Sequence, residues 1–201
     1  QPQFFHPGVW LKNFVLGRLA QQCDALAINL QIDSDTIKSA SIRVPAGGVE
    51  EPRAESIPFD FAGAEVPFEE RIVLDRDVFS NFGSAVRGRI APLVSDPLVE
   101  TYWPLAKRRL RETENLGECL AQSRHQLEGQ WGVATLEIPQ SAVCRFEAFH
   151  WFTAHLLAHL PRLWDVYNGS LAEYRRANRL RSHSHPAADL AADGPWLEAP
   201  F

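Results

Sequence analysis

The sequence has no methionine and only three cysteines among its 201 residues. Cys23, Cys119 and Cys144 lie far apart and form no CxxC pair, so they supply no zinc framework, and their sparse, odd number is typical of a reducing cytoplasm. The neighbours of Cys23 and Cys144 are apolar, which predicts small buried core residues. Because the chain starts at Gln1 and ends on apolar residues up to Phe201, we expect it to be a fragment of a longer cytoplasmic protein.

An excess of positive charge and a long hydrophobic run are also absent. The 25 acidic residues outnumber the 20 basic ones, for a net charge of −5, and no basic stripe outweighs the acids, which argues against a nucleic-acid partner. No apolar run approaches the ~20 residues that cross a membrane, and no secretory signal opens the chain, so no membrane partner is expected. The oligomeric state stays open. Hydrophobic residues make up 45% of the chain, which suffices for one sizeable core.

The front of the chain predicts a helix followed by a strand. Pro7 and Gly8 end a loop, and apolar residues then recur at helical spacing as far as Cys23 or Asp24. Residues 26–32 are short, apolar and rich in β-branched side chains, which favours a buried central strand. Further along, we expect a loop over 46–56 and a solvated acidic segment over 60–70. A helix capped by Asp75 or Asp77 should follow.

This alternation of strands and helices predicts an α/β fold with a Rossmann-like, mostly parallel sheet and a helix-rich insertion or second lobe. We expect a single domain over residues 1–201. Its sheet core is expected in residues 1–75 and 131–139, and its helical parts in residues 76–130 and 141–181.

The start of the first helix is a candidate anion site. A helix start offers unpaired amides and a partial positive charge, and a nearby lysine strengthens the attraction for phosphate or carboxylate. Gly8 precedes this helix directly, Lys12 and Asn13 occupy its first turns, and His6 stands just before it. The alternative is an ordinary surface lysine and a loop histidine.

Two carboxylates end the apolar strand and form a second candidate site. In open α/β sheets, ligands bind beyond the carboxyl ends of the strands. Asp33 and Asp35 stand where a hydroxyl, an amine or a magnesium ion would be held, with Lys38 close behind. One of them could also act as a general base. The alternative is that Ser34 or Asp35 caps a turn.

A basic cluster follows the last long helical pattern. Arginine grips phosphate or carboxylate in bidentate fashion, so this run is a candidate binding segment, although basic residues also suit a helix C-terminus through the dipole. The predicted ligand-binding members are Arg175, Arg179, Arg181 and His185. Upstream, His155 and His159 are four residues apart, a spacing that can bind zinc. The glutamate of an HExxH motif is absent between them, and we predict an ordinary histidine pair and no metal.

The opening QPQFFHPGVWLKNF, then a helix and an apolar strand that ends in acidic residues, resembles the start of the bacillithiol-biosynthesis cysteine ligase family. Over residues 1–40 that family has a Gln-rich loop, a helix with a lysine and an acidic-His-acidic cluster in a Rossmann-type nucleotide-binding core. This chain has Ser34 at the position of that histidine. The resemblance is greater to an uncharacterised bacterial family that shares HPGVWLKNF, a D-x-D-T-x-K-S run and a late HP. The carried-over positions are Gln3, His6, Gly8, Lys12, Asp33 and Asp35.

Three functions follow as hypotheses. The first is a ligase-like or transferase-like enzyme on a small anionic or sugar-linked metabolite, with ATP or another nucleotide as its cofactor. In it Lys12 holds the anion, His6 donates a proton or contacts phosphate, and Asp33 or Asp35 is the base. The second is a non-catalytic ligand-binding or interaction protein on the same fold. The third is a metal-dependent hydrolase that uses His155 and His159.

Overall fold

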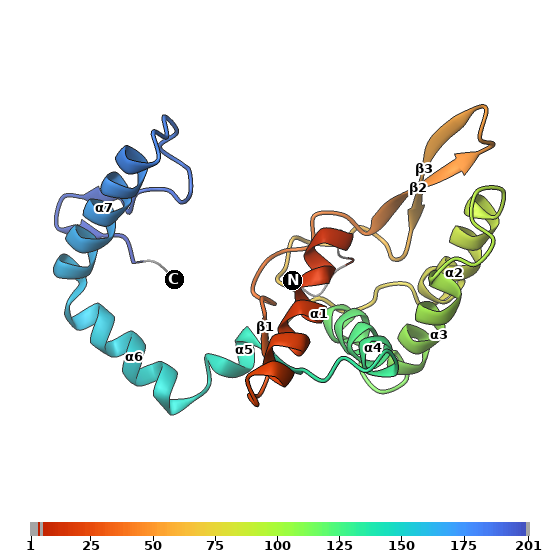
Figure 1. Ribbon diagram of the computed structural model, residues 1–201, viewed down its shortest axis with the longest axis horizontal. Coiled ribbons are helices and arrows are strands. Elements are labelled where there is room, and N and C mark those ends of the chain that lie inside the picture. Colours follow the sequence, from red (N-terminus) through yellow and green to blue (C-terminus); the bar gives the residue numbers. More distant parts are fainter. Residues whose placement is uncertain (1–3, 5, 200–201) are drawn as a thin grey trace. The chain divides into compact units, whose positions relative to one another are not determined.

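The computed structural model describes Phe4 and residues 6–199 and is shown in Figure 1. It confirms a mixed α/β chain, with seven helices and three two-stranded sheets in this described part. The chain divides into two compact units, Gln1–Val143 and Cys144–Phe201. The expectation of a single domain stays a prediction. No helix among the described residues is long and apolar enough to cross a membrane.

Side-chain caps by Asp75 and Asn115 begin two long helices of the first unit. Asp75 accepts hydrogen bonds from the amides of Asp77 and Val78, both at 2.8 Å, as the sequence predicts. Asn115 accepts the amide of Glu118 at 2.8 Å in the same way. Each cap satisfies amides that have no partner inside the helix. The helices of this unit are α1 (Pro7–Gln22), α2 (Arg76–Ile90), α3 (Val99–Arg109), α4 (Leu116–Gln130) and α5 (Gln140–Val143).

Two separate strand pairs accompany these helices. Strand β1 (Ile28–Gln31) runs parallel to β4 (Leu136–Pro139), and β2 (Ser41–Gly47) pairs antiparallel with β3 (Pro52–Pro58). The predicted loop over 46–56 is therefore wrong, because much of it belongs to this hairpin. The predicted buried central strand is also wrong, since Ile28 and Leu30 are 50% and 48% exposed. Strand β1 has one neighbour among the described residues, so no second strand covers its other edge.

The hydrophobic core gathers side chains from α2, α3, α4 and the β2–β3 hairpin; α2 packs against the hairpin, and α3 packs against both α2 and α4 (Figure 1). Trp103 stands at its centre, with ring centroids 4.6 Å from Phe79 and 4.4 Å from Phe82, and its indole N–H donates to the Phe79 carbonyl at 2.6 Å. Cys119 is a buried member of this core. The expectation for Cys23 is wrong, because Cys23 is exposed at the end of α1.

A buried ion pair fixes the connection from β3 to α2. Asp60 accepts from the Arg71 guanidinium at 3.1 Å and from the amides of Leu74 and Asp75 at 3.0 and 2.9 Å. Both charged side chains are almost fully buried, so each satisfies the other where water is excluded. The predicted solvated acidic segment is therefore wrong at Asp60, which holds the cap of α2 in place.

The described part of the second unit contains two helices and a short sheet. Helices α6 (Glu147–Ala158) and α7 (Leu160–Ala177) agree in type with the predicted helical tracts, and β5 (Ala192–Asp193) pairs with β6 (Trp196–Leu197). Asn168 on α7 donates its amide to the Leu190 carbonyl at 3.0 Å and accepts the Leu190 amide at 2.9 Å. This reciprocal pair attaches the segment before β5 to α7.

Candidate functional site

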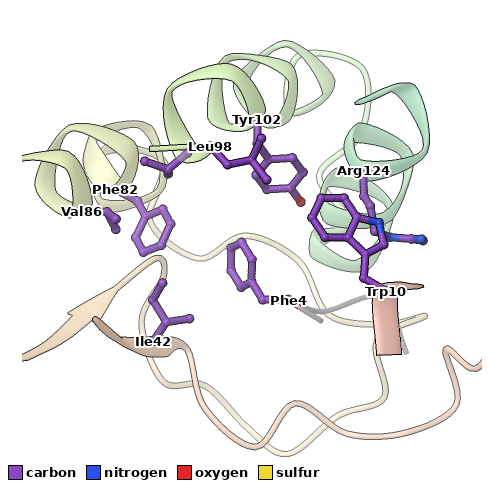
Figure 2. Close-up of a pocket in the computed structure, with 9 residues that line it drawn as sticks. Phe4, Trp10, Ile42, Phe82, Val86, Leu98, Tyr102 and Arg124 are labelled. Atoms are coloured by element: carbon purple, nitrogen blue, oxygen red, sulfur yellow. The ribbon is translucent and has the colours of Figure 1, made fainter. Parts of the chain in front are cut away.

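A cavity of about 230 Å³ opens among the core elements of the first unit (Figure 2). It is bounded by α1, β2, α2, α3 and α4. Among the described residues, most of its lining is aromatic or aliphatic, and Arg124 is its one charged side chain. The lining residues are Phe4, Trp10, Ile42, Phe82, Val86, Leu98, Val99, Tyr102 and Arg124.

The polar groups of the lining gather toward one end. In Figure 2, Trp10 and Arg124 lie together at one side, and Ile42 and Val86 lie at the other. The Tyr102 hydroxyl donates to the Leu120 carbonyl at 2.8 Å. Burial raises the pKa of Tyr102 well above its usual range, against the opposing effect of the Arg124 charge, so the phenol stays neutral. The cavity therefore has an apolar body and a polar end, where the charged side chain of Arg124 lies.

A fully buried carboxylate, Glu128, stands behind that polar end. Its side chain is 0% exposed. Its Oε1 accepts three hydrogen bonds, from the Trp10 indole at 2.6 Å, from the Asn13 amide at 2.9 Å and from the Arg124 guanidinium at 3.1 Å. A buried carboxylate needs such donors, because leaving water costs a charged group several kcal/mol. Glu128 thereby joins α1 to α4.

Arg124 connects this cluster to the parallel strand pair. Its second amino group donates to Oε1 of Glu137 on β4 at 2.6 Å, and Asn29 on β1 donates to the same oxygen at 2.8 Å. The resulting network, named here the Glu128 network, contains two carboxylates and one guanidinium, for a formal charge of −1. Helical geometry explains its local part, since residues four apart, such as Arg124 and Glu128, share one face of α4.

The predicted anion site at the start of α1 has its amides already bonded. Gly8 donates its amide to Nδ1 of His6 at 3.1 Å, and Val9 and Trp10 donate theirs to the His6 carbonyl at 2.8 and 3.0 Å. Lys12 is exposed, and anion binding at this helix start stays a prediction. Asn13 lies elsewhere, buried in the Glu128 network. Gln3 lies outside the described residues.

The predicted strand-end carboxylates have local partners. Asp33 is buried, and its two oxygens accept from the amide of Ser141 at 2.9 Å and from its hydroxyl at 2.5 Å, so it anchors the start of α5. Asp35 accepts the Thr36 amide at 2.8 Å. Lys38 is exposed. These contacts give Asp33 a structural role, and a ligand role for the pair stays a prediction.

The predicted basic cluster belongs to the second unit. Arg175 is buried and binds Asp189 at 2.7 Å, and its guanidinium also donates to the carbonyls of His183, His185 and Ala187. It therefore holds the segment that follows α7. The remaining predicted members, Arg179, Arg181 and His185, are exposed. Their binding of an anion stays a prediction.

Sequence reasoning did not single out the residues at the polar end of the cavity. Arg124, Glu128 and Glu137 belong to none of the motifs that the sequence analysis describes. One signal was present: Arg124 and Glu128 stand four apart within an apolar helical pattern, where an ion pair can be buried.

His155 and His159, whose ring centroids are 4.5 Å apart, form a pair in which Nδ1 of His159 lies 2.8 Å from the His155 carbonyl.

Comparison with known proteins supplies no relative from which a role for these residues could be transferred. No protein-family model, curated protein or solved structure matches this chain.

Proposed function

We propose that this protein binds a compact, largely apolar small molecule that carries one polar group, and that the cavity of Figure 2 is the binding site. The observation that supports the proposal is the lining itself, which combines an apolar wall with the buried guanidinium of Arg124 at one end. Binding pockets for small molecules have this composition, with a few polar groups fixing the orientation of an apolar ligand.

The volume sets the size of the ligand. A cavity of roughly 150 Å³ holds benzene, so 230 Å³ suits a molecule of about ten heavy atoms. At about −0.5 kcal/mol per heavy atom, the affinity of such a ligand is on the order of 0.1–1 mM. The polar group would meet Arg124, whose charge is shared with Glu128 and Glu137. Because these two carboxylates repel a negative ligand, a neutral amide should bind at least as well as a carboxylate.

Calorimetric titration with three ligands of one shape tests the proposal. Para-toluamide, para-toluate and para-xylene share an aromatic body and differ in the polar group. We expect para-toluamide to bind best and para-xylene worst. Equal affinity for all three would show that the polar end takes no part in binding.

A cavity-filling variant locates the binding. Leu98 lines the cavity and is 42% exposed, so Leu98→Trp should occupy the opening without disturbing the core. We expect this variant to lower the affinity for para-toluamide at least about tenfold, because a packed interior has no room for both the indole ring and the ligand. Val94→Trp is the matched control: Val94 is 40% exposed, lies shortly before α3 and does not line the cavity. Equal loss in both variants, or in neither, would contradict this site.

The enzyme hypothesis rests on Lys12 and has a separate test. ATP and sugar phosphates, titrated in parallel, should bind more weakly to Lys12→Ala than to the unchanged chain if the start of α1 holds an anion. The bonded amides of Gly8, Val9 and Trp10 argue for little effect. Unchanged affinity for each anion that binds would remove the α1 anion site.

We also propose that the β1–β4 pair is part of a Rossmann-like sheet in a cytoplasmic protein. The parallel register, with Ile28 opposite Leu136, and the position of α1 before β1 support this arrangement. Three free cysteines suit a reducing compartment. An experimental structure in which further parallel strands extend the pair would support the proposal. One in which β1 and β4 remain a two-strand sheet would contradict it.

A further inference from the structure

We propose that His125, Glu128 and Glu137 form a binding site for a divalent transition-metal ion. His125 and Glu128 stand three residues apart on α4, and Glu137 lies on the adjacent strand β4. One ligand atom from each of the three side chains lies within 4.8 Å of the others. Zinc-ligand distances of about 2.0–2.1 Å place the ligand atoms of a tetrahedral site about 3.4 Å apart, so small side-chain rotations suffice to close the site.

Two unpartnered buried atoms indicate that the site accepts a ligand. Oε2 of Glu128 is buried and has no hydrogen-bond partner in the described part of the chain, although the side chain is fully enclosed. Nδ1 of His125 is likewise buried and unpartnered there. An unsatisfied buried carboxylate oxygen is costly, and most such groups in folded proteins have a partner. A cation between these atoms would supply one for both.

The hydrogen bonds of the two carboxylates are divided in a way that suits metal ligation. All three donors to Glu128 reach Oε1, and both donors to Glu137 also reach Oε1. Neighbouring donors that hold one oxygen orient the carboxylate and leave the other oxygen for a metal. Arg124 and Asn29 would then be positioning residues, since neither would contact the ion itself.

Charge and donor type select the class of ion. With a neutral His125, the Glu128 network carries a formal charge of −1, and a cation reverses it. One imidazole nitrogen with two carboxylate oxygens suits zinc or manganese, whereas magnesium prefers oxygen ligands and retains its waters. His125 is partly exposed and also lines an open depression between α3 and α4, so this one proposed ligand borders solvent.

Calorimetry on the full chain, first stripped with a chelator and then titrated with zinc or manganese chloride, tests the proposal. We expect one equivalent of metal to bind. His125→Ala should lower the metal affinity at least about tenfold, as the loss of a metal ligand or of a residue that orients one does. Glu137→Gln keeps an acceptor for Asn29 and Arg124 but removes the charge, and should weaken the ion similarly. Glu118→Gln, on an exposed position of the same helix, should change nothing.

Unchanged affinity in His125→Ala, or the absence of binding by the unchanged chain, would overturn the proposal. So would binding that His155→Ala abolishes and His125→Ala leaves intact. Neither His125 nor Glu137 belongs to the hydrophobic core, and circular dichroism of each variant checks whether it is folded. Broadening of indole signals by manganese locates the ion without any variant. The Trp10 signal should broaden first, because its N–H contacts Glu128, and broadening at Trp151 alone would overturn the site.

Discussion

Replacing Glu128 by alanine removes the acceptor on which three donors converge, two of them buried and one half-buried. Its Oε1 binds Trp10, Asn13 and Arg124 at 2.6–3.1 Å, and the side chain has no access to water. Breaking one partner out of a buried ion pair costs about 3–5 kcal/mol, because the remaining charge and donors stay desolvated. We expect Glu128→Ala to lower the free energy of unfolding by about that much. A domain is typically stable by about 5–15 kcal/mol, so the variant should be close to unfolding in its first unit.

Glu128→Gln removes the charge of the side chain and keeps its shape. The amide keeps an acceptor oxygen but forms weaker hydrogen bonds than a carboxylate, so a loss of about 1–3 kcal/mol is expected. The control is Gln126→Ala, on an exposed position of α4. Its free energy of unfolding should stay within about 0.5 kcal/mol of the wild-type value.

Urea unfolding followed at the Trp10 indole signal measures these changes in the first unit alone, which is necessary because the chain has two compact units. Arg124→Ala completes a double-mutant cycle, and contact between the two side chains predicts a coupling of about 0.5–3 kcal/mol. The reasoning would be refuted if Glu128→Ala were no more destabilising than Gln126→Ala.

Two further predictions concern Asp33 and Cys119. Asp33→Asn should lower stability by about 0.5–2 kcal/mol, as the loss of a cap does, and should leave para-toluamide binding unchanged in calorimetry. Intact stability with weaker binding would instead support a ligand role for Asp33. Burial raises the pKa of the Cys119 thiol from 9.0 to about 11, so its stabilising contribution is complete below pH 9 and is lost as the pH rises through 11. The free energy of unfolding should therefore fall between pH 9 and 11 by an amount on the order of 2 kcal/mol, less steeply in Cys119→Ala, and equal slopes in urea titrations would contradict this.

Local signals in the sequence predict the helices well. Asp75 and Asn115 stand directly before apolar residues at helical spacing, and each caps its helix in the structure. These features depend on neighbours within a few residues, which a sequence displays openly.

Strand β3 of the hairpin is not predictable in the same way. Residues 46–56 are rich in Gly, Pro and Glu, and most of β3 is exposed, so no alternation of apolar and polar residues marks the strand. Its apolar contacts come from Ile57 and Phe59, near and beyond its end. The sequence pattern of β1 fails in the opposite sense. Its apolar run predicts a buried strand, whereas its apolar side chains are half-exposed in the structure.

The Glu128 network is the part of the candidate site that sequence reasoning could not assemble. Trp10 and Asn13 are 118 and 115 residues from Glu128 along the chain, and Asn29 is 108 from Glu137. No local pattern links positions so far apart, since tertiary packing decides which charges meet. Asn13, which the sequence predicts to bind a ligand, donates to Glu128 in this network, and its ligand role stays a prediction.

Carbon-13 methyl NMR during a titration with para-toluamide tests the central claim most directly, because the cavity is lined by the methyl groups of Val86, Leu98 and Val99. We predict saturable shifts at these methyls and intermolecular Overhauser contacts from the ligand ring to Val86. The exposed methyls of Val94 should stay unchanged. Saturable shifts that bypass Val86 and Val99, or no saturable shift at millimolar ligand, would contradict the assignment of this cavity as the binding site.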